Sequence, residues 1–245
     1  MNALLAAVEF ARTMADVSNT QKLEDALAQV CARMGIRFFA LSHHVDFASA
    51  PFGLRIHNYP DGWQDWYDAN RLGLSDPIHR ASHKSVGGFL WRDVPHIIPI
   101  NANDKYLLAK GRRIGLGEGV TVPTHVPGEA CGSCTFVAQS GVPLPEDVLP
   151  WAQLVGTFAF EGARRIARRK TPPPLKLSER QRQCVALAGR GKSNRQIAAM
   201  LGIGEQTVME HMREARQKLG VSTRTQLVVR LLADGNICFD DIMKR

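Results

Sequence analysis

The segment from Gly191 to Val221 reads GKSNRQIAAMLGIGEQTVMEHMREARQKLGV and carries two helical patterns around a turn that contains two glycines. The first pattern runs from Ser193 to Ile203, and the second follows Gly204. Apolar residues recur every three or four positions in both, which predicts two amphipathic helices. These residues are Ile197, Ala198 and Leu201 in the first helix and Val208, Met212, Ala215 and Leu219 in the second. Two short helices joined by such a turn have the spacing of a helix-turn-helix motif.

The second helix presents polar and charged side chains away from its apolar face. Side chains of these types can reach base edges in a major groove. In this helix the candidates for base contacts are Met209, Glu210, Arg213, Arg216 and Gln217. Other residues of the motif can bind the phosphates of the DNA backbone. The candidates are Lys192, Asn194, Thr207, His211 and Lys218. We therefore expect a unit that binds double-stranded DNA. The alternative is a helical interaction module that does not bind DNA.

Helical signals continue on both sides of this motif. Ser178 can cap a helix over ERQRQCVALAGRG that ends at its glycines, and RTQLVVRLLADG predicts a last helix. Upstream, the three prolines Pro172–Pro174 cannot continue a helix and favour an extended spacer. The sequence thus predicts a body over residues 1–169, a linker over 170–176 and an all-α helix-turn-helix domain over 177–245.

The net charge of the chain, +8, is unevenly distributed. Residues 1–163 hold 13 Lys and Arg against 16 Asp and Glu, whereas residues 164–245 hold 18 against 7. A small basic unit attached to a slightly acidic body favours a polyanionic partner for that unit. Charge alone leaves open a basic surface that only keeps the protein in solution.

The body mixes strand and helix patterns. Apolar and polar residues alternate in IRFFALSHHV (36–45), GVTVPTHV (119–126) and CGSCTFVAQ (131–139), which predicts strands. Helices are predicted over 21–34, 61–72, 77–84, 103–114 and 146–169. The apolar face of the last helix is expected to contain Val148, Leu154, Phe158, Ala159 and Ile166. Hairpin-like strands with helices on their faces predict an α+β fold, an α/β/α sandwich with an antiparallel sheet.

Composition argues against several classes of protein. No apolar run is long enough to span a bilayer. The N-terminal MNALLAAVEFARTMADV lacks a basic start and is interrupted by Glu9, so we expect no signal peptide, no membrane partner and a cytoplasmic location. The five cysteines are odd in number and irregularly spaced, which argues against a disulfide framework. We find no ligand cluster for a metal and no nucleophile motif for an enzyme.

Two of the cysteines, Cys131 and Cys134, have C-x-x-C spacing. A thioredoxin-like pair lies at the N-terminus of a helix that follows a strand. This pair lies in a predicted strand, where residues three apart point to opposite faces. We expect both to be small core thiols, with redox sensing as the alternative.

The helix-turn-helix segment resembles the DNA-binding domain of LuxR-type transcriptional regulators. The family pattern is roughly L-[TS]-x-R-E-x-E, then G-K-S-x-x-E-I-A-x-x-L and T-V-x-x-H-x-x-x-A-x-x-K-L. The chain keeps most of these positions from Leu177 to Leu219. It has Gln181, Gln183 and Gln196 where the family usually has glutamate, and Gly204 where it usually has a serine cap. Glutamine keeps hydrogen-bonding capacity but loses the charge.

The body resembles the autoinducer-binding domain of the quorum-sensing members of that family. The segment NYPDGWQDWYDANRLGLSDPIHRASHKSVGGFLW keeps the family order Y-P-x-x-W, Y, D-P and W, and Gly119 and Pro123 match the glycine and proline that follow. Thr135 falls where the family often has a Ser or Thr that bonds the acyl carbonyl of the ligand. The chain departs from the family's P-x-H-G-x-x-G, because it reads PTHVPGEACG over 123–132.

An N-acyl homoserine lactone suits the side chains of this segment. Asp76 can accept from the amide N–H, the indole of Trp63 can donate to the lactone carbonyl, and the phenol of Tyr59 can donate to the amide carbonyl. Tyr67 and Trp91 would bury the acyl chain. The alternatives are core packing for the aromatic residues and a helix cap before a proline for Asp76.

Three residues of the first predicted strand, Ala40, Ser42 and His44, should share one face. If this face lines the pocket, Ser42 and His44 make it polar, which favours a short, oxygenated or aromatic acyl group. The alternative is that His44 is a satisfied surface or core histidine.

The resemblance implies a transcription factor that binds an N-acyl homoserine lactone in its body and promoter DNA through its helix-turn-helix. We expect a homodimer, since two such motifs read a two-fold DNA site, and no cofactor beyond the small-molecule ligand. Ligand burial would favour the DNA-competent state by a population shift. Three alternatives stay open: a regulator of the same fold that senses a non-lactone molecule or none, a thiol-based redox regulator, and a lactone hydrolase.

Overall fold

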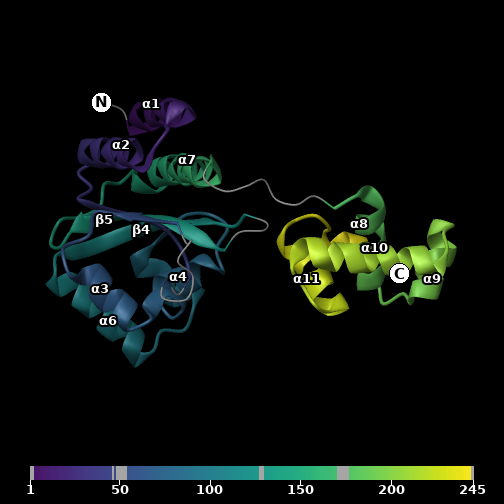
Figure 1. The fold of residues 1–245 in the computed structure, drawn as a ribbon. Helices are drawn as coiled ribbons and strands as arrows, with labels where there is room; N and C mark the ends of the chain where they lie inside the picture. The colour runs from purple at the N-terminus through teal and green to yellow at the C-terminus, as the bar shows by residue number, and fades with distance from the viewer. Residues whose placement is uncertain (1–2, 46, 48–53, 127–129, 170–176, 244–245) are drawn as a thin grey trace. The chain divides into compact units, whose positions relative to one another are not determined.

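The computed structural model describes residues 3–45, 47, 54–126, 130–169 and 177–243 (Figure 1). They form two compact units, one on each side of the three consecutive prolines, and each unit has its own hydrophobic core. The predicted linker, residues 170–176, lies outside the described residues. None of the described helices is long and apolar enough to cross a membrane.

An antiparallel sheet forms the middle layer of the first unit, with the strand order β2-β1-β5-β4-β3 (Figure 1). Its strands are β1 Phe38–His43, β2 Arg55–His57, β3 Phe89–Leu90, β4 Leu116–Thr124 and β5 Gly132–Gln139. The α+β prediction and the three longer strands are confirmed. The two edge strands were not predicted, because three and two residues are too few for an alternating pattern to show.

The two faces of the sheet differ in polarity, because successive side chains of a strand point to opposite sides. One face belongs to the main core and carries Phe39, Leu41, Ile56, Val120, Val122, Cys134 and Phe136. The other face carries Ala40, Ser42, Arg55, His57, Thr121, Ser133 and Thr135. This polar part of the second face lines a cavity, whereas Leu116 and Val137 of the same face form a small hydrophobic core with Trp63 and Leu107.

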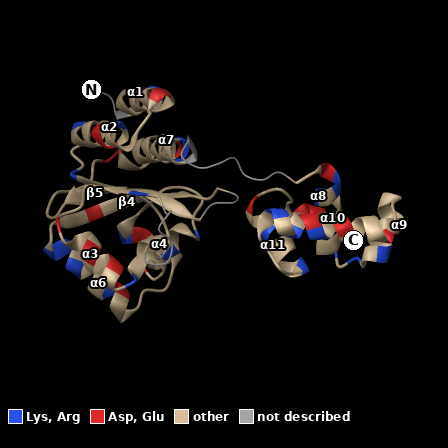
Figure 2. Cartoon of the chain, in the orientation of Figure 1, with Lys and Arg blue, Asp and Glu red and all other residues tan. Residues whose placement is uncertain are grey.

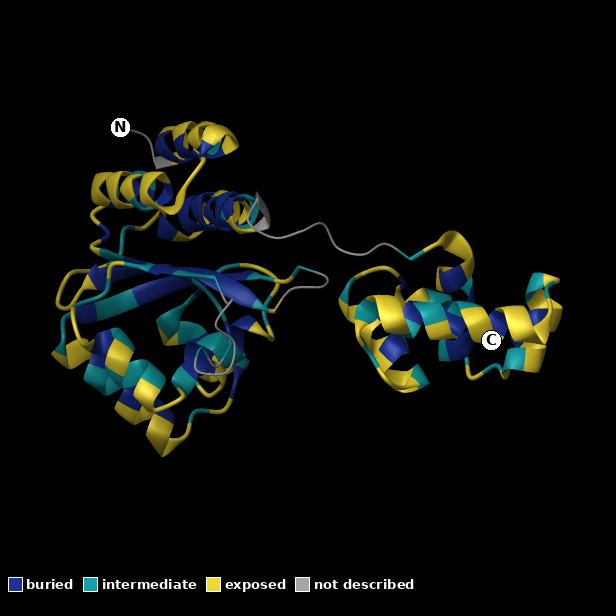
Figure 3. Ribbon diagram, in the orientation of Figure 1, coloured by how far each residue is buried: buried dark blue, intermediate teal, exposed yellow. Residues whose placement is uncertain are grey.

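Three helices cover the apolar face: α1 Ala3–Asp16, α2 Thr20–Arg33 and α7 Val148–Arg169 (Figure 1). The helix α1 was not predicted. At Gly156, α7 approaches the sheet so closely that a Cβ would lie 3.0 Å from the Cβ of Val122. The same side of α7 packs Trp151 edge-on against Phe136 of β5. The helix carries both buried and exposed residues (Figure 3). Phe158 is 41% exposed, so the prediction that it lies on the apolar face was wrong.

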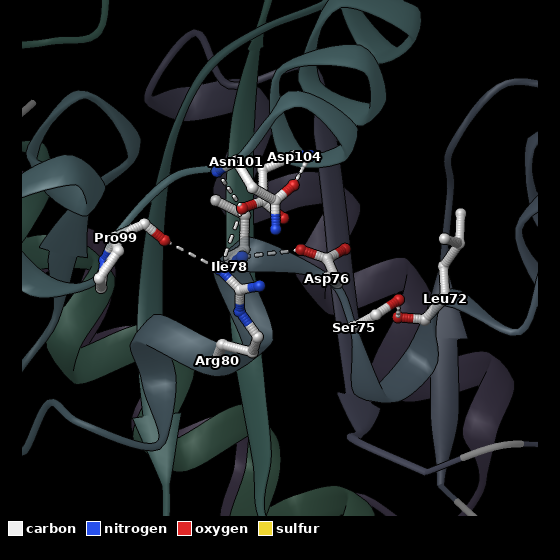
Figure 4. Close-up of polar contacts among 8 residues, drawn as sticks. All are labelled: Leu72, Ser75, Asp76, Ile78, Arg80, Pro99, Asn101 and Asp104. Carbon is white, nitrogen blue, oxygen red and sulfur yellow. Dashed lines mark hydrogen bonds and ion pairs between the residues drawn. The ribbon is translucent and has the colours of Figure 1, made fainter.

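Shorter elements cover the polar face: α3 Trp63–Ala69, η1 Leu72–Leu74, α4 Pro77–Ser82, η2 Trp91–Asp93, α5 Val94–Ile97 and α6 Ala102–Arg113. The helix predicted over 61–72 is shorter than expected because Arg71 adopts a left-handed conformation, with φ of 51°. The buried carboxylate of Asp104 joins α6 to α4, since it caps α6 together with Asn101 and accepts from Arg80 at 3.0 Å (Figure 4).

The second unit is all-α, as predicted, with α8 Glu179–Gly189, α9 Asn194–Leu201, α10 Glu205–Leu219, α11 Arg224–Ala233 and α12 Phe239–Met243. The side chains of Ser178, Ser193 and Thr223 cap α8, α9 and α11. Both helices of the predicted helix-turn-helix end at a glycine with positive φ. The core contains the predicted Ile197, Ala198, Val208, Met212 and Ala215.

The two thiols of the C-x-x-C segment have different environments. Cys134 lies within β5 on the apolar face, and burial raises the pKa of its thiol, which disfavours redox chemistry there. Cys131 precedes the strand and is half-buried. The prediction that both are core thiols is therefore wrong for Cys131, because β5 begins one residue later than expected.

Candidate functional site

A cavity lies between the polar face of the sheet and the helices α3, α4 and α6. Its empty space is about 820 Å³ when its opening is counted, a size typical of small-molecule sites. The fold brings together all eight residues that were predicted to contact a ligand, which are Ala40, Ser42, Tyr59, Trp63, Tyr67, Asp76, Trp91 and Thr135.

The strand register arranges the floor of the cavity in rows. One row, the Thr135 row, crosses four strands and consists of Thr121, Thr135, Ala40 and His57. The next, the Ser133 row, lies two residues along the strands and consists of Pro123, Ser133, Ser42 and Arg55. At about 3.3 Å per residue, the two rows are roughly 7 Å apart.

Asp76 is held in the cavity wall by both of its carboxylate oxygens. Oδ1 accepts from the backbone N–H of Ile78 at 2.7 Å and caps α4 (Figure 4), and Oδ2 accepts from the phenol of Tyr67 at 2.9 Å. Burial, and then the charge of Asp76, raises the pKa of Tyr67, so its phenol remains a donor. The helix cap and the position in the cavity wall therefore coexist, because a carboxylate has about four acceptor sites.

Trp91 is fixed by hydrogen bonds that cross the sheet. Its indole N–H donates to Oγ1 of Thr121 at 2.9 Å, and that hydroxyl lies 2.9 Å from Oγ1 of Thr135. The ring also lies against Gly119, where a Cβ would come within 2.5 Å of Cε2. Glycine at this position thus permits Trp91 to reach the cavity.

Two donors in the cavity wall have no hydrogen-bond partner among the described residues: the phenol of Tyr59 and the indole N–H of Trp63. Trp63 is the first residue of α3, and its ring centroid lies 6.2 Å from that of Tyr67. Tyr59 packs edge-on against Phe38, and burial raises the pKa of its phenol. Both groups are therefore protonated donors.

The cavity also contains polar residues that the sequence did not single out: Arg55, His57, Gln64, His79 and Ser133. Arg55 donates from Nη1 to both carboxylate oxygens of Asp68 at 2.8 Å, so its charge is neutralised. The available signal for Arg55 and His57 was their alternation with Ile56, which is too short to identify a strand by itself.

His44 does not line the cavity with Ala40 and Ser42, because β1 ends at His43. It lies between Ser133 and α4, next to the cavity, and is only 4% exposed, with Nε2 at 2.9 Å from Oγ of Ser133 and Nδ1 at 2.9 Å from Nε2 of His83. The cavity-face prediction for His44 is therefore wrong, and its interpretation as a satisfied core histidine is correct.

The ring of His44 stacks on that of His79 with 3.8 Å between centroids. Burial, and then the neighbouring histidines, lower the pKa of His44, so its ring is neutral at pH 7. In the described part of the chain, these and the other His, Cys, Asp and Glu residues form no group suited to a metal ion.

In the second unit, α9 and α10 form the helix-turn-helix, and α10 presents a polar surface. Its exposed residues include Thr207, Met209, Glu210, Arg213 and Gln217, whereas His211 and Arg216 are half-buried. Glu210 and Arg213 form an ion pair across one turn, and this hydrogen-bonded contact lowers the pKa of Glu210. Figure 2 shows that basic and acidic residues both occur along the helices of this unit.

Some of the predicted phosphate contacts also bond within the unit. The side-chain oxygen of Asn194 accepts from Nη1 of Arg224 at 2.9 Å, and the carbonyl of Lys192 accepts from the same guanidinium. Arg224 was not singled out from the sequence, and it fixes the start of α9. Nζ of Lys218 donates to Oε1 of Gln181 at 3.1 Å.

The structure gives a reason for glutamine at position 181. Its buried side chain accepts from the N–H of Ser178 at 3.0 Å and donates from Nε2 to Glu214 at 2.7 Å. A glutamate could make the first contact but not the second, because an ionised carboxylate has no donor.

Two family models match the chain. The model described as autoinducer binding domain matches residues 19–163, and that of bacterial regulatory proteins of the luxR family matches residues 175–231. Together they span both units.

Individual relatives match over most of their length. The transcriptional activator protein AhyR of Aeromonas hydrophila is 24% identical over 238 residues, which cover 93% of this chain and 90% of AhyR. The quorum sensing-dependent transcriptional regulator RpaR of Rhodopseudomonas palustris is 29% identical over 185 residues, 74% of each chain. The crystal structure of Escherichia coli SdiA has a TM-score of 0.76 at 20% identity and covers 96% of this chain and 98% of SdiA.

Proposed function

The chain belongs to the LuxR-type quorum-sensing transcriptional regulators, and we propose that its ligand is an N-acyl homoserine lactone. It is a ligand-responsive, DNA-binding regulator with an autoinducer-binding domain and a helix-turn-helix domain. We assign ligand binding to residues 1–169, the linker to 170–176 and DNA binding to 177–245, in a cytoplasmic homodimer.

The choice of ligand class rests on the donors in the cavity that have no partner among the described residues. The phenol of Tyr59 and the indole N–H of Trp63 lack partners among the described residues, and Asp76 keeps acceptor sites beside them. An N-acyl homoserine lactone offers two carbonyls and one amide N–H, which complement two donors and one acceptor. Because buried polar groups without partners are costly, a ligand that satisfies all three gains affinity.

We assign the remaining contacts from the position of each residue in the cavity. Thr135 would bond the acyl carbonyl, since its hydroxyl keeps capacity beyond its contact with Thr121. Tyr67 and Trp91 would form the walls around the acyl chain, and Ala40 and Ser42 its floor.

For DNA, we assign base contacts to Met209, Glu210, Arg213, Arg216 and Gln217 and phosphate contacts to Lys192, Asn194, Thr207, His211 and Lys218. Arg213 must leave Glu210 to reach a guanine, and Lys218 must leave Gln181 to reach a phosphate. DNA contact therefore competes with hydrogen bonds of the free protein. Two copies of α10 would read a two-fold site.

A thermal melt of the full chain with a panel of acyl homoserine lactones tests the ligand class. A lactone at about 100 times its Kd adds about 2.7 kcal/mol, roughly 5–10 °C in Tm for a chain of this size. Asp76→Asn should abolish the shift, whereas Asp65→Asn, an exposed site on α3, should keep it. No shift with any lactone would refute the assignment.

A non-lactone ligand is the second candidate, because the Ser133 row gives the cavity more polar groups than a lactone with a plain acyl chain can satisfy. One solved structure of SdiA is a complex with octanoyl-rac-glycerol, so acylglycerols belong in the same panel. A shift with an acylglycerol and none with any lactone would favour this candidate.

A further inference from the structure

The cavity has a second polar region beyond the groups assigned to the lactone and amide. Three lining side chains of the Ser133 row form it, and we name them the distal polar group: Ser42, Arg55 and Ser133. The Ser133 row lies about 7 Å along the strands from the Thr135 row. An acyl chain that leaves the amide in this direction ends among these side chains.

The hydroxyl of Ser42 lacks a partner in the part of the chain that the structure describes. The neighbouring His57 lies in the Thr135 row, and its Nδ1 is enclosed by the protein without a partner among the described residues. Burial, and then the charge of Arg55, lower the pKa of His57, so its neutral ring offers one donor and one acceptor. A plain alkyl chain would bury the Ser42 hydroxyl without a hydrogen bond, which is unfavourable.

Ser133 is oriented by two histidines behind it. Its Oγ lies 2.9 Å from Nε2 of His44, whose Nδ1 lies 2.9 Å from Nε2 of His83. In one tautomer His44 donates to Ser133, and the Ser133 O–H is then free to donate into the cavity. In the other, the serine oxygen keeps a lone pair for the cavity. In both cases the hydroxyl has capacity left for a ligand.

The distal polar group suits a neutral partner better than an anion. Arg55 brings the positive charge, but both oxygens of Asp68 already accept from it at 2.8 Å. The ring of His57 is neutral for the reason given above. A carboxylate placed here would lose its hydration without gaining a free counter-charge.

We infer that the ligand carries a hydroxyl, as an aliphatic alcohol or a phenol, at the far end of its acyl chain, and that Ser42 and Ser133 select for it. A hydroxyl both donates and accepts, which matches a serine hydroxyl and a neutral imidazole. This inference rests on the proposed function in one respect, that the ligand is an acyl compound with its head group near Asp76.

Matched ligand pairs test the inference by isothermal titration of the full chain. The probes are butanoyl-, hexanoyl- and octanoyl-homoserine lactone, each with its terminally hydroxylated counterpart, and the same three pairs as acylglycerols. In at least one pair we expect the hydroxylated member to bind about tenfold tighter or more.

The outcomes separate the inference from the proposed function. Lactones that bind, with no gain from the hydroxyl in any pair, overturn the inference and leave the lactone assignment intact. A hydroxyl preference among acylglycerols, with no lactone bound, supports the inference and overturns that assignment. Binding of none of the probes overturns both.

Serine variants identify the selecting groups. Ser42→Ala and Ser133→Ala should each reduce the preference for the hydroxylated probe several-fold while leaving the Kd of the plain probe unchanged or lower. Ser85→Ala is the matched control, because Ser85 bonds the carbonyl of Ala81 outside the cavity and should keep the preference. Should Ser133→Ala not fold, Ser42→Ala carries the test, and an unchanged preference there overturns the role of the serines.

Discussion

The buried His44 should make the first unit sensitive to mild acid. The ring is 4% exposed, and both of its nitrogens are engaged, with Ser133 and with His83. The titratable neighbours that act on its pKa are all histidines. They are His79 and His83 from α4 and its end, His43 from β1, and His125 after β4. Burial and these histidines lower the pKa of His44 far below its ordinary value of 6.5.

The sign of the effect follows from the protons bound in each state. Below pH 6.5 the unfolded chain binds a proton at His44 that the folded protein does not bind. The free energy of unfolding therefore decreases as the pH is lowered. The stabilisation is fully present above pH 6.5 and is lost on acidification. One such group gives a slope of about 1.36 kcal/mol per pH unit, or about 2 kcal/mol between pH 6.5 and 5.

Urea unfolding at several pH values between 7.5 and 5 measures this slope. Tryptophan fluorescence reports the first unit alone, because all four tryptophans lie in it. The His44→Gln variant should be less stable than the wild type at neutral pH. Below pH 6.5 its free energy of unfolding should depend less steeply on pH, by about 1.4 kcal/mol per pH unit. His96→Gln is the control, since His96 is exposed on α5. Parallel curves for the wild type and His44→Gln would refute the reasoning.

Other perturbations test the remaining contacts. Gln181→Glu should lower the free energy of unfolding of the second unit by about 1–3 kcal/mol, because it removes the donor to Glu214. Gln196→Glu, in an exposed helix cap, should change it by less than about 0.5 kcal/mol, and equal effects in urea unfolding followed by circular dichroism would contradict this. Gly119→Ala should displace Trp91 and weaken ligand binding in titration calorimetry, whereas Gly87→Ala, with nothing within 4 Å, should not. Glu210→Gln should release Arg213 and tighten binding to a DNA duplex in fluorescence anisotropy, and unchanged affinity would argue against competition between the ion pair and DNA.

Periodicity predicted most of the long elements, because each has a face committed to one core, but α1 was missed. The helix α10 buries Val208, Met212 and Ala215 as its spacing predicts. The same approach failed for α7 at Phe158, since the side that packs on the sheet runs through Trp151, Gly156 and Phe160 and leaves Phe158 exposed. It missed β2 because an edge strand of three residues has no measurable period.

The candidate site was predictable only where a residue's chemistry and spacing identify it. Tyr59, Trp63 and Asp76 were found in this way. Ser133 was missed although it lies two residues before Thr135 and therefore on the same face of β5. His57 reaches the cavity through cross-strand register, which pairs positions far apart in the chain and cannot be read from its short strand alone. His44 was misplaced because the end of β1 at His43 depends on backbone pairing rather than on side-chain pattern.

The cavity's polar groups also explain how a ligand can affect the folded unit. Asp76 caps α4, Trp91 holds η2 to β4 through Thr121, and Tyr67 joins α3 to Asp76, so these elements are fixed to one another before any ligand binds. Among the described residues, the phenol of Tyr59, the indole N–H of Trp63 and the hydroxyl of Ser42 are cavity donors without a partner. A ligand changes a conformational equilibrium only by its different affinity for the two states. We expect the affinity difference to arise where its oxygens meet these donors, because an unfolded or opened unit satisfies them with water instead.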